Sequence, residues 1–224
     1  MSKRITVAID GPAGSGKSTL ARRIAARLGY AYVDTGAMYR AVALWALRTK
    51  VALSDMHRLE QLAKEARIEF NSDSSAVLLN GEDVTREIRE SEIGAAASKI
   101  SQVAAVRRAL VAKQRAIGEQ TSVVMEGRDI GSVVFPDATV KIFLDAQPDK
   151  RTERRAQELS LPAAAVAQQI HERDRRDRTR SESPLVQAPD AVYVDTTPLT
   201  IDEVEAALLK LIRDRTSNGK ERTH

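Results

Sequence analysis

The stretch from Ile5 to Leu20 constrains the fold of this chain most. It reads ITVAIDGPAGSGKSTL, in which a short apolar run leads into spaced glycines, a lysine and a serine. The spacing G-x-x-x-x-G-K-[ST] is that of a phosphate-binding loop, whose glycines let backbone N–H groups point at phosphate oxygens. In this pattern Lys17 reaches the β- and γ-phosphates, and the Ser18 hydroxyl takes a place on Mg²⁺.

The residues on either side of this loop predict a strand before it and a helix after it. Apolar residues recur at helical spacing over Lys17 to Leu28, and Gly29 stands where a glycine commonly ends a helix. The N-terminus of such a helix favours an anion. The alternative is an ordinary glycine-rich turn that binds nothing, and the pattern and its context together disfavour it.

Length and composition narrow the class of protein. The 224 residues suit one compact α/β domain, and the absence of cysteine excludes disulfides, thiolate zinc sites and a cysteine nucleophile. No apolar run approaches the ~20 residues of a membrane span, so we expect a cytoplasmic protein. The net charge of +4 could suggest nucleic acid. However, arginines cluster at Arg151 to Arg155 and Arg173 to Arg180 without interleaved aromatics, which favours a compact polyphosphate.

Alternating patterns predict an open α/β sheet. Four more apolar runs read as strands: Tyr30–Asp34, Ser122–Met125, Val140–Asp145 and Ala191–Asp195. Helical patterns cover Ala41–Leu47, Ser54–Ala66, Glu87–Gln120, Asp149–Leu159, Ala163–Arg178 and Ile201–Arg213, and a polar tail from Thr216 to His224 is expected to be frayed. Ligands of such sheets bind at the carboxyl edge of the strands.

A small antiparallel insertion interrupts this alternation between Arg67 and Arg86. Short β-like segments at Ile68–Phe70, Ala76–Leu79 and Val84 are separated by polar residues. The second separator, Asn80-Gly81, is a strong hairpin signal.

Polar side chains follow two of the predicted strands. We interpret Thr35-Gly36 as a turn that places Thr35, Tyr39 and Arg40 at the carboxyl edge, where Arg40 is a candidate for a second phosphate. The alternative puts Tyr39 in the core and Arg40 in solvent. Glu126 to Asp129 leave the third strand at the same edge, where loops commonly carry function.

Two further groups stand out on predicted helices. Arg173, Asp177 and Arg180 are spaced so that one helical face presents all three, although a charge run is commonly a solvated, salt-bridged surface. Ser98 and Arg107 stand out in an alanine-rich stretch, although helical serines are commonly solvated or bonded to their own backbone.

The joint occurrence of these motifs resembles the bacterial cytidylate kinases, of the nucleoside monophosphate kinase group, over nearly the whole chain. The phosphate loop alone would indicate only a P-loop NTPase, and the predicted insertion resembles the extended monophosphate-binding subdomain of that family. The matching segments are IDGPAGSGKST (Ile9–Thr19), DTGAMYRA (Asp34–Ala41), EGRDIGSVVFPDA (Glu126–Ala138), KIFLDA (Lys141–Ala146), RDRRDRTR (Arg173–Arg180) and PL…A-D…VDTT (Pro184–Thr197).

The resemblance implies a P-loop three-layer α/β/α fold with a five-stranded parallel sheet, a helical lid and a small antiparallel β insertion. It divides the chain into a core (1–34, 87–148, 181–224), a monophosphate-binding region (35–86) and a lid (149–180). Departures at Thr35, Glu126 and Ser132 keep the hydroxyl or carboxylate that relatives carry there, so we read no loss of function.

The resemblance also implies roles for particular residues. The loop that holds the ATP triphosphate comprises Gly11, Pro12, Ala13, Gly14, Ser15, Gly16, Lys17, Ser18 and Thr19. The monophosphate site includes Thr35, Tyr39 and Arg40, and the surroundings of the cytosine include Ser98, Arg107 and Asp129. Arg128 and Arg180 approach phosphates and, with Lys17, are the catalytic cations; Arg173 and Asp177 approach the ribose or a phosphate.

The implied activity is ATP- and Mg²⁺-dependent phosphorylation of CMP or dCMP by a monomer that uses neither nucleic acid nor membrane as a partner. One alternative is a P-loop kinase for UMP, AMP, dTMP or shikimate. Another is an ATP-driven regulator or nucleic-acid motor, which commonly needs an apolar strand that ends in an acidic pair. Here the candidate strands end in Glu126-Gly127 and in a lone Asp145.

Overall fold

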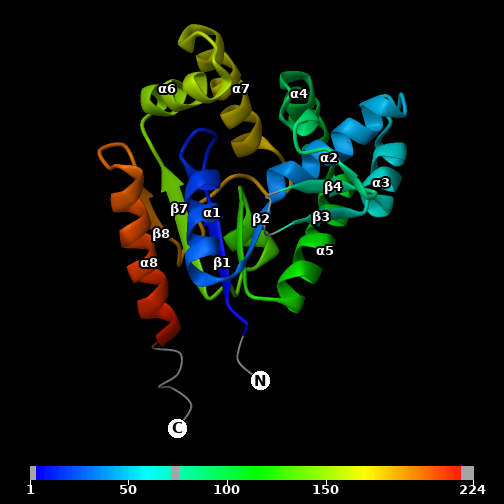
Figure 1. Cartoon of the computed structure of the whole chain (residues 1–224). Helices are drawn as coiled ribbons and strands as arrows, with labels where there is room; N and C mark the ends of the chain where they lie inside the picture. The colour runs from blue at the N-terminus through cyan, green and yellow to red at the C-terminus, as the bar shows by residue number, and fades with distance from the viewer. Residues whose placement is uncertain (1–3, 72–75, 218–224) are drawn as a thin grey trace. The chain divides into compact units, whose positions relative to one another are not determined.

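The computed structural model describes residues 4–71 and 76–217, which divide into two compact units (Figure 1). The core unit comprises residues 4–32 and 121–217, and the inserted unit comprises residues 33–71 and 76–120. The division into core, monophosphate-binding region and lid groups residues by their role in a reaction, and it stays a prediction.

The core unit is built on a five-stranded sheet with the order β2-β6-β1-β7-β8. Its strands are β1 (Thr6–Asp10), β2 (Ala31–Asp34), β6 (Val123–Gly127), β7 (Val140–Asp145) and β8 (Val192–Asp195), and β2 crosses the boundary between the units. The pairs β1–β6, β1–β7 and β7–β8 are parallel, so the carboxyl ends of these strands share one edge. The five strands are those predicted, and the α/β fold class is confirmed.

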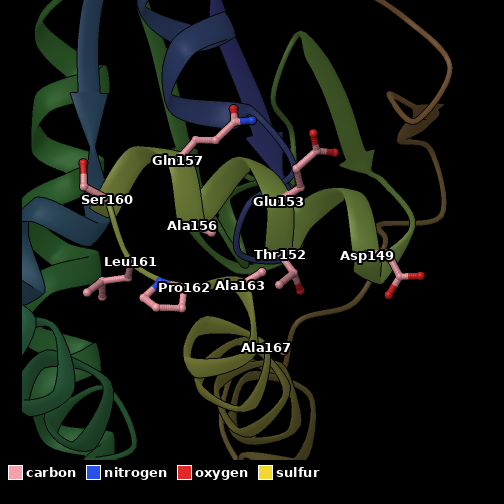
Figure 2. Close-up of a pocket in the computed structure, with 10 residues that line it drawn as sticks. All are labelled: Asp149, Thr152, Glu153, Ala156, Gln157, Ser160, Leu161, Pro162, Ala163 and Ala167. Atoms are coloured by element: carbon pink, nitrogen blue, oxygen red, sulfur yellow. The ribbon is translucent and has the colours of Figure 1, made fainter.

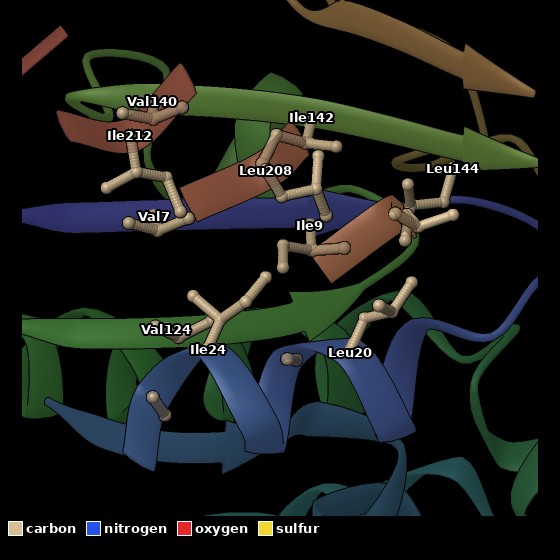
Figure 3. Packing of buried hydrophobic residues seen from close by; sticks show 13 residues of the cluster. Val7, Ile9, Leu20, Ile24, Val124, Val140, Ile142, Leu144, Leu208 and Ile212 are labelled. Atoms are coloured by element: carbon tan, nitrogen blue, oxygen red, sulfur yellow. The ribbon is translucent and has the colours of Figure 1, made fainter. Parts of the chain in front are cut away.

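Two helices, α1 (Lys17–Leu28) and α8 (Ile201–Ser217), pack with the sheet into one hydrophobic core (Figure 3). Residues two apart in a strand face the same side, so Val7 and Ile9 both reach this core. Ile24 of α1 and Leu208 of α8 meet them there. The core thereby fixes the start of α1, and with it the phosphate loop, against the carboxyl end of β1. Helix α8 extends beyond its predicted end at Arg213, and residues 218–224 of the predicted frayed tail lie outside the described residues.

The helices α6 (Pro148–Leu159) and α7 (Ala163–Thr179) follow β7 and have a small core of their own. Ala156, Val166 and Ile170 are buried together there. Ser160 ends α6 in the left-handed region, with φ 53°, which turns the chain into α7. The pair is therefore held together by its own apolar contacts.

The inserted unit carries helices α2 (Thr35–Arg48), α3 (Met56–Glu65), α4 (Ser91–Ile100) and α5 (Ala104–Gln120), and a short turn η1 (Glu87–Arg89). It also holds the antiparallel sheet β3 (Ile68–Phe70), β4 (Val77–Leu79) and β5 (Glu82–Asp83). Asn80 and Gly81 both have positive φ, 53° and 87°, as a two-residue hairpin turn requires. The predicted insertion and its hairpin are confirmed, but its third strand is Glu82–Asp83 and not the predicted Val84. Residues 72–75 lie outside the described part of the chain.

The predicted Thr35-Gly36 turn is wrong, because helix α2 begins directly at Thr35. The Asp34 carboxylate accepts a hydrogen bond from the Ala37 N–H at 2.9 Å and so caps the helix. A Cβ at Gly36 would lie 3.1 Å from Asp34 Oδ1, so the glycine makes room for this cap. Thr35, Tyr39 and Arg40 consequently all lie in the first two turns of one helix.

The single helical stretch predicted over Glu87 to Gln120 is also wrong, since it breaks between α4 and α5. The Ser101 hydroxyl donates to the Ser98 carbonyl at 2.9 Å at the end of α4. Such local bonds compete with helix continuation. Because of the break, Ser98 lies on α4 and Arg107 lies on α5.

Candidate functional site

The phosphate loop folds around the Lys17 side chain. Gly14 and Gly16 adopt positive φ values of 76° and 92°, which residues with a Cβ disfavour. These values set the direction of the loop's backbone N–H groups. The Lys17 ammonium donates to the Pro12 carbonyl at 2.6 Å and to Ser15 Oγ at 3.3 Å. Because Lys17 starts α1, the ammonium and the helix N-terminus act on the same volume. The arrangement suits an anion.

The residue after Lys17 contacts a carboxylate that sequence reasoning did not assign. The Ser18 hydroxyl donates to Glu126 Oε2 at 3.0 Å, and the Tyr32 hydroxyl donates to Glu126 Oε1 at 2.6 Å. Mg²⁺ takes oxygen ligands and is commonly held by one or two protein oxygens plus substrate phosphates. The Ser18–Glu126 pair therefore fits that ion. The signal in the sequence was that Glu126 directly follows the apolar run Ser122–Met125, which was predicted to be a buried strand.

A cluster of paired charges adjoins this loop in the core unit. Arg128 Nε donates to Asp177 Oδ2 at 2.8 Å, and Arg180 lies 3.8 Å from the other oxygen of Asp177. Arg180 Nη2 is also 3.6 Å from Asp129 Oδ1. The structure thus brings together four of the predicted site residues, from the end of β6 and the end of α7.

Burial and neighbouring cations lower the pKa of Lys17 from 10.5 to about 7. Burial contributes most, followed by the charges of Arg128 and, further down, Arg173, while Glu126 and Asp10 act in the opposite direction. For Asp177, burial raises the pKa, but the charges of Arg128 and Arg173 outweigh it and hold the pKa below 3.8. Arg173 therefore belongs electrostatically to the same cluster.

Arg180 reaches the cluster by a different route from the one predicted. Helix α7 ends at Thr179, and Arg180 has extended backbone angles, φ −63° and ψ 142°, so the spacing of one helical face does not apply to it. Its side chain is nonetheless only 4% exposed and donates to the Ser183 carbonyl. The alternative of a fully solvated charged helix is also wrong, because Asp174 and Asp177 are buried.

Arg151 is a second residue that sequence reasoning left unassigned. It is buried, and its guanidinium donates to the Ala13 carbonyl of the phosphate loop at 3.1 Å and to Asp174 Oδ2 at 2.5 Å. Nε donates to the Ala146 carbonyl at 3.0 Å. One side chain of α6 thereby ties the loop to α7.

The predicted residues of the inserted unit form a cluster of their own. The Arg107 guanidinium lies over the Tyr39 ring at 5.5 Å, and Arg40 Nη1 donates to the Ile88 carbonyl at 2.8 Å. Ser98 is buried, and its Oγ has no hydrogen-bond partner among the described residues. A buried hydroxyl in that state is costly, and a polar ligand would satisfy it. Thr35 is buried at the start of the same helix that carries Tyr39.

A cavity of about 610 Å³ opens between α6 and α7 (Figure 2). Its walls include Thr152, Gln157 and Leu161, and none of its described lining residues is a predicted site residue. It therefore has no part in the candidate site.

Comparison with known proteins decides the family. The family model for cytidylate kinase matches residues 7–214. The chain belongs to the cytidylate kinase family. The cytidylate kinase of Solibacter usitatus (strain Ellin6076) is 59% identical over 98% of this chain and 97% of its own length. That of Geobacter sp. (strain M21) is 46% identical over 96% of this chain and 95% of its own length.

Solved structures agree with the family on the fold. A gluconokinase from Sinorhizobium meliloti 1021 superposes with a TM-score of 0.54 at 15% identity, covering 99% of this chain and 100% of that one.

None of the described helices combines the length and the apolar character that crossing a bilayer needs.

Proposed function

We propose that the protein transfers the γ-phosphoryl group of ATP to CMP or dCMP, giving ADP and CDP or dCDP. The observation that carries the proposal is its 59% identity, over 98% of the chain, to a protein named cytidylate kinase. The phosphate loop around Lys17 and the adjoining arginine–aspartate cluster supply the cations that such a transfer needs.

The acceptor in this reaction is already an anionic phosphate oxygen, so the site needs no strong base and no covalent nucleophile. Catalysis then consists of aligning two phosphates that repel each other and neutralising charge on the group in transit. In the proposal, Lys17 holds the β- and γ-phosphates, while Arg128 and Arg180 approach the group in transit. Asp177 keeps both guanidinium groups oriented through its two oxygens. When bound, Mg²⁺ neutralises phosphate charge, with Ser18 and Glu126 as the residues that would hold it.

We propose that Arg40 binds the acceptor phosphate beside Thr35 and Tyr39, and that Ser98, Arg107 and Asp129 surround the cytosine. The buried Ser98 hydroxyl and the Arg107 guanidinium offer donors, and the Asp129 carboxylate offers acceptors, for a base that carries both kinds of group. Arg173 and Asp177 then approach the ribose or a phosphate. We propose further that the protein acts as a monomer, on small molecules only.

Helices α6 and α7 are the proposed lid over residues 149–180. Their separate small core supports movement as one body, and closure keeps water from the phosphoryl group. Hydrogen exchange should therefore show protection gained across residues 153–180 when a bisubstrate mimic binds, while the amides of Val204 to Ile212 in α8 stay unchanged. Equal exchange of 153–180 with and without the mimic would exclude closure of this pair.

Binding of ATP is expected to take up protons near pH 8. The pKa of Lys17 is about 7 in the free protein, so at pH 8 about nine-tenths of this residue is neutral. A bound triphosphate favours the charged form and raises the pKa, so close to one proton enters per ATP at pH 8 and far less at pH 6. Calorimetry in buffers of different ionisation enthalpy measures this. The control is Lys17→Arg, whose guanidinium stays charged; equal uptake by both proteins would contradict the assignment to Lys17.

A coupled ADP-release assay across nucleoside monophosphates tests the identity of the acceptor. CMP and dCMP are expected to give the highest kcat/KM among CMP, dCMP, UMP, AMP and dTMP. A clear preference for AMP or dTMP would replace the proposed acceptor while leaving the kinase chemistry in place.

A further inference from the structure

Asp10 is a buried carboxylate that lies outside the phosphate-loop motif and was not among the predicted site residues. It ends β1, and its side chain accepts hydrogen bonds from the Ile130 N–H at 2.8 Å and the Gly131 N–H at 2.7 Å. Burial raises its pKa to about 6, and these two bonds act in the opposite direction. The carboxylate thus links the strand before the phosphate loop to residues that follow Asp129.

The segment that Asp10 binds is the start of a helical turn, η2 (Ile130–Val134). The first N–H groups of such a turn have no partner within it. The residue in the capping position is Asp129, whose carbonyl accepts from the Val133 and Val134 N–H groups at 2.9 and 3.1 Å. Aspartate is among the residues that cap a helix best, yet the Asp129 side chain makes no capping bond.

The Asp129 side chain is instead directed towards Arg180, and its Oδ1 lies 3.6 Å from Arg180 Nη2. The two acceptors that the turn needs come from Asp10, on the neighbouring strand. A Cβ at Gly131 would lie 3.4 Å from Asp10 Oδ2, which is an ordinary contact, and 3.2 Å from the Lys141 stem, which it would crowd more. The Lys141 ammonium bonds Asp190 at 2.8 Å, so its charge is directed to another carboxylate.

We propose that Asp10 is a positioning residue for recognition of the acceptor nucleotide. By capping the turn from β1, Asp10 makes the Asp129 side chain available to Arg180. The same side chain then contacts the cytosine, a role that rests on the proposed function. Without the Asp10 oxygens, the Asp129 carboxylate is in place to cap its own turn. Capping would move it away from the proposed binding site of the nucleotide. Asp10 therefore acts through Asp129 and does not itself contact the base.

The test is Asp10→Asn, which keeps the size of the side chain but presents an amide to one of the two N–H groups. Leaving a buried donor unsatisfied shifts equilibria by about 10-fold or more, so KM for CMP should rise by about that factor. KM for ATP should change by less than about 3-fold, since Lys17 keeps its bonds to Pro12 and Ser15 and the charge of Asp10 is the weakest of the influences on its pKa. A general structural defect would instead affect both substrates and the melting temperature alike.

A double-mutant cycle with Asp129→Ala separates positioning from stability. If Asp10 acts through Asp129, adding Asp10→Asn to Asp129→Ala should raise KM for CMP little further, whereas independent effects multiply. Glu205→Gln, which neutralises another buried carboxylate, on α8 beside Arg23 and Arg27, should leave KM for CMP unchanged. Should Asp10→Asn not fold, Asp10→Glu keeps the carboxylate but displaces it by one methylene from the Ile130 and Gly131 N–H groups, and it should raise KM for CMP selectively.

Three results are decisive. A selective, non-additive rise in KM for CMP supports the positioning role. Normal KM for CMP in both Asp10→Asn and Asp10→Glu, with wild-type protein active on CMP, would overturn the positioning role and leave the proposed function intact. Wild-type protein inactive on CMP would overturn the proposed function, and the role of Asp10 with it.

Discussion

Replacing Lys17 by alanine should lower kcat for CMP phosphorylation by about 100-fold or more, because it removes a preorganised cation that stabilises charge on the transferred phosphoryl group. The melting temperature should stay close to that of the wild type. Burial and the charges of Arg128 and Arg173 disfavour the charged form of Lys17 in the free protein. Removing the side chain therefore removes an unfavourable buried charge, which offsets the loss of the hydrogen bond to the Pro12 carbonyl. Steady-state kinetics and thermal melts on the same preparation measure both quantities.

The matched control is Lys64→Ala, which removes an exposed lysine of α3 that forms a surface salt bridge with Glu60. Such pairs contribute little, so both kcat and stability should hold. A Lys17→Ala protein that phosphorylates CMP at close to the wild-type rate would refute the role given to the phosphate loop.

Replacing Gly11 by alanine should destabilise the core unit by about 4 kcal/mol or more and abolish transfer. Gly11 has φ 151°, and a Cβ there would lie 1.9 Å from the Leu144 carbonyl oxygen. This oxygen belongs to β7, which pairs with β1 on one side and β8 on the other, so it cannot move aside without breaking the sheet. Denaturant unfolding of the two proteins gives the difference in free energy.

Gly29→Ala separates this clash from the ordinary cost of a positive φ. Gly29 has φ 66°, but no atom lies within 4 Å of its Cβ position. The conformational cost alone is about 1–2 kcal/mol, and activity should persist. If alanine at Gly11 costs no more than alanine at Gly29, the loop is not packed against β7 as described.

The parts of the fold that were predicted correctly depend on local signals. Apolar runs marked all five strands of the sheet, and in the central strands β1, β6 and β7 these runs are buried, as is typical of parallel strands. The glycine spacing marked the phosphate loop, and Asn80-Gly81 marked a hairpin whose two residues indeed have positive φ. Each of these signals lies within a few residues of the structure that it predicts.

The errors arose where capping or a distant partner decides the structure. Asp34 caps α2 through its own side chain, which converts a supposed Thr-Gly turn into the first turn of a helix. Arg151 was interpreted only as one of a cluster of arginines in the lid, because its partner Asp174 lies 23 residues away. Asp10 meets Ile130 across 120 residues, so a pattern search in one sequence has no means to pair them.

Phosphoryl transfer to CMP can be followed with ATP that carries ³²P in its γ-phosphoryl group. With wild-type protein, magnesium and CMP, we expect the label to appear in CDP and little of it to appear as inorganic phosphate. Label found only in inorganic phosphate, or left in ATP, would contradict it.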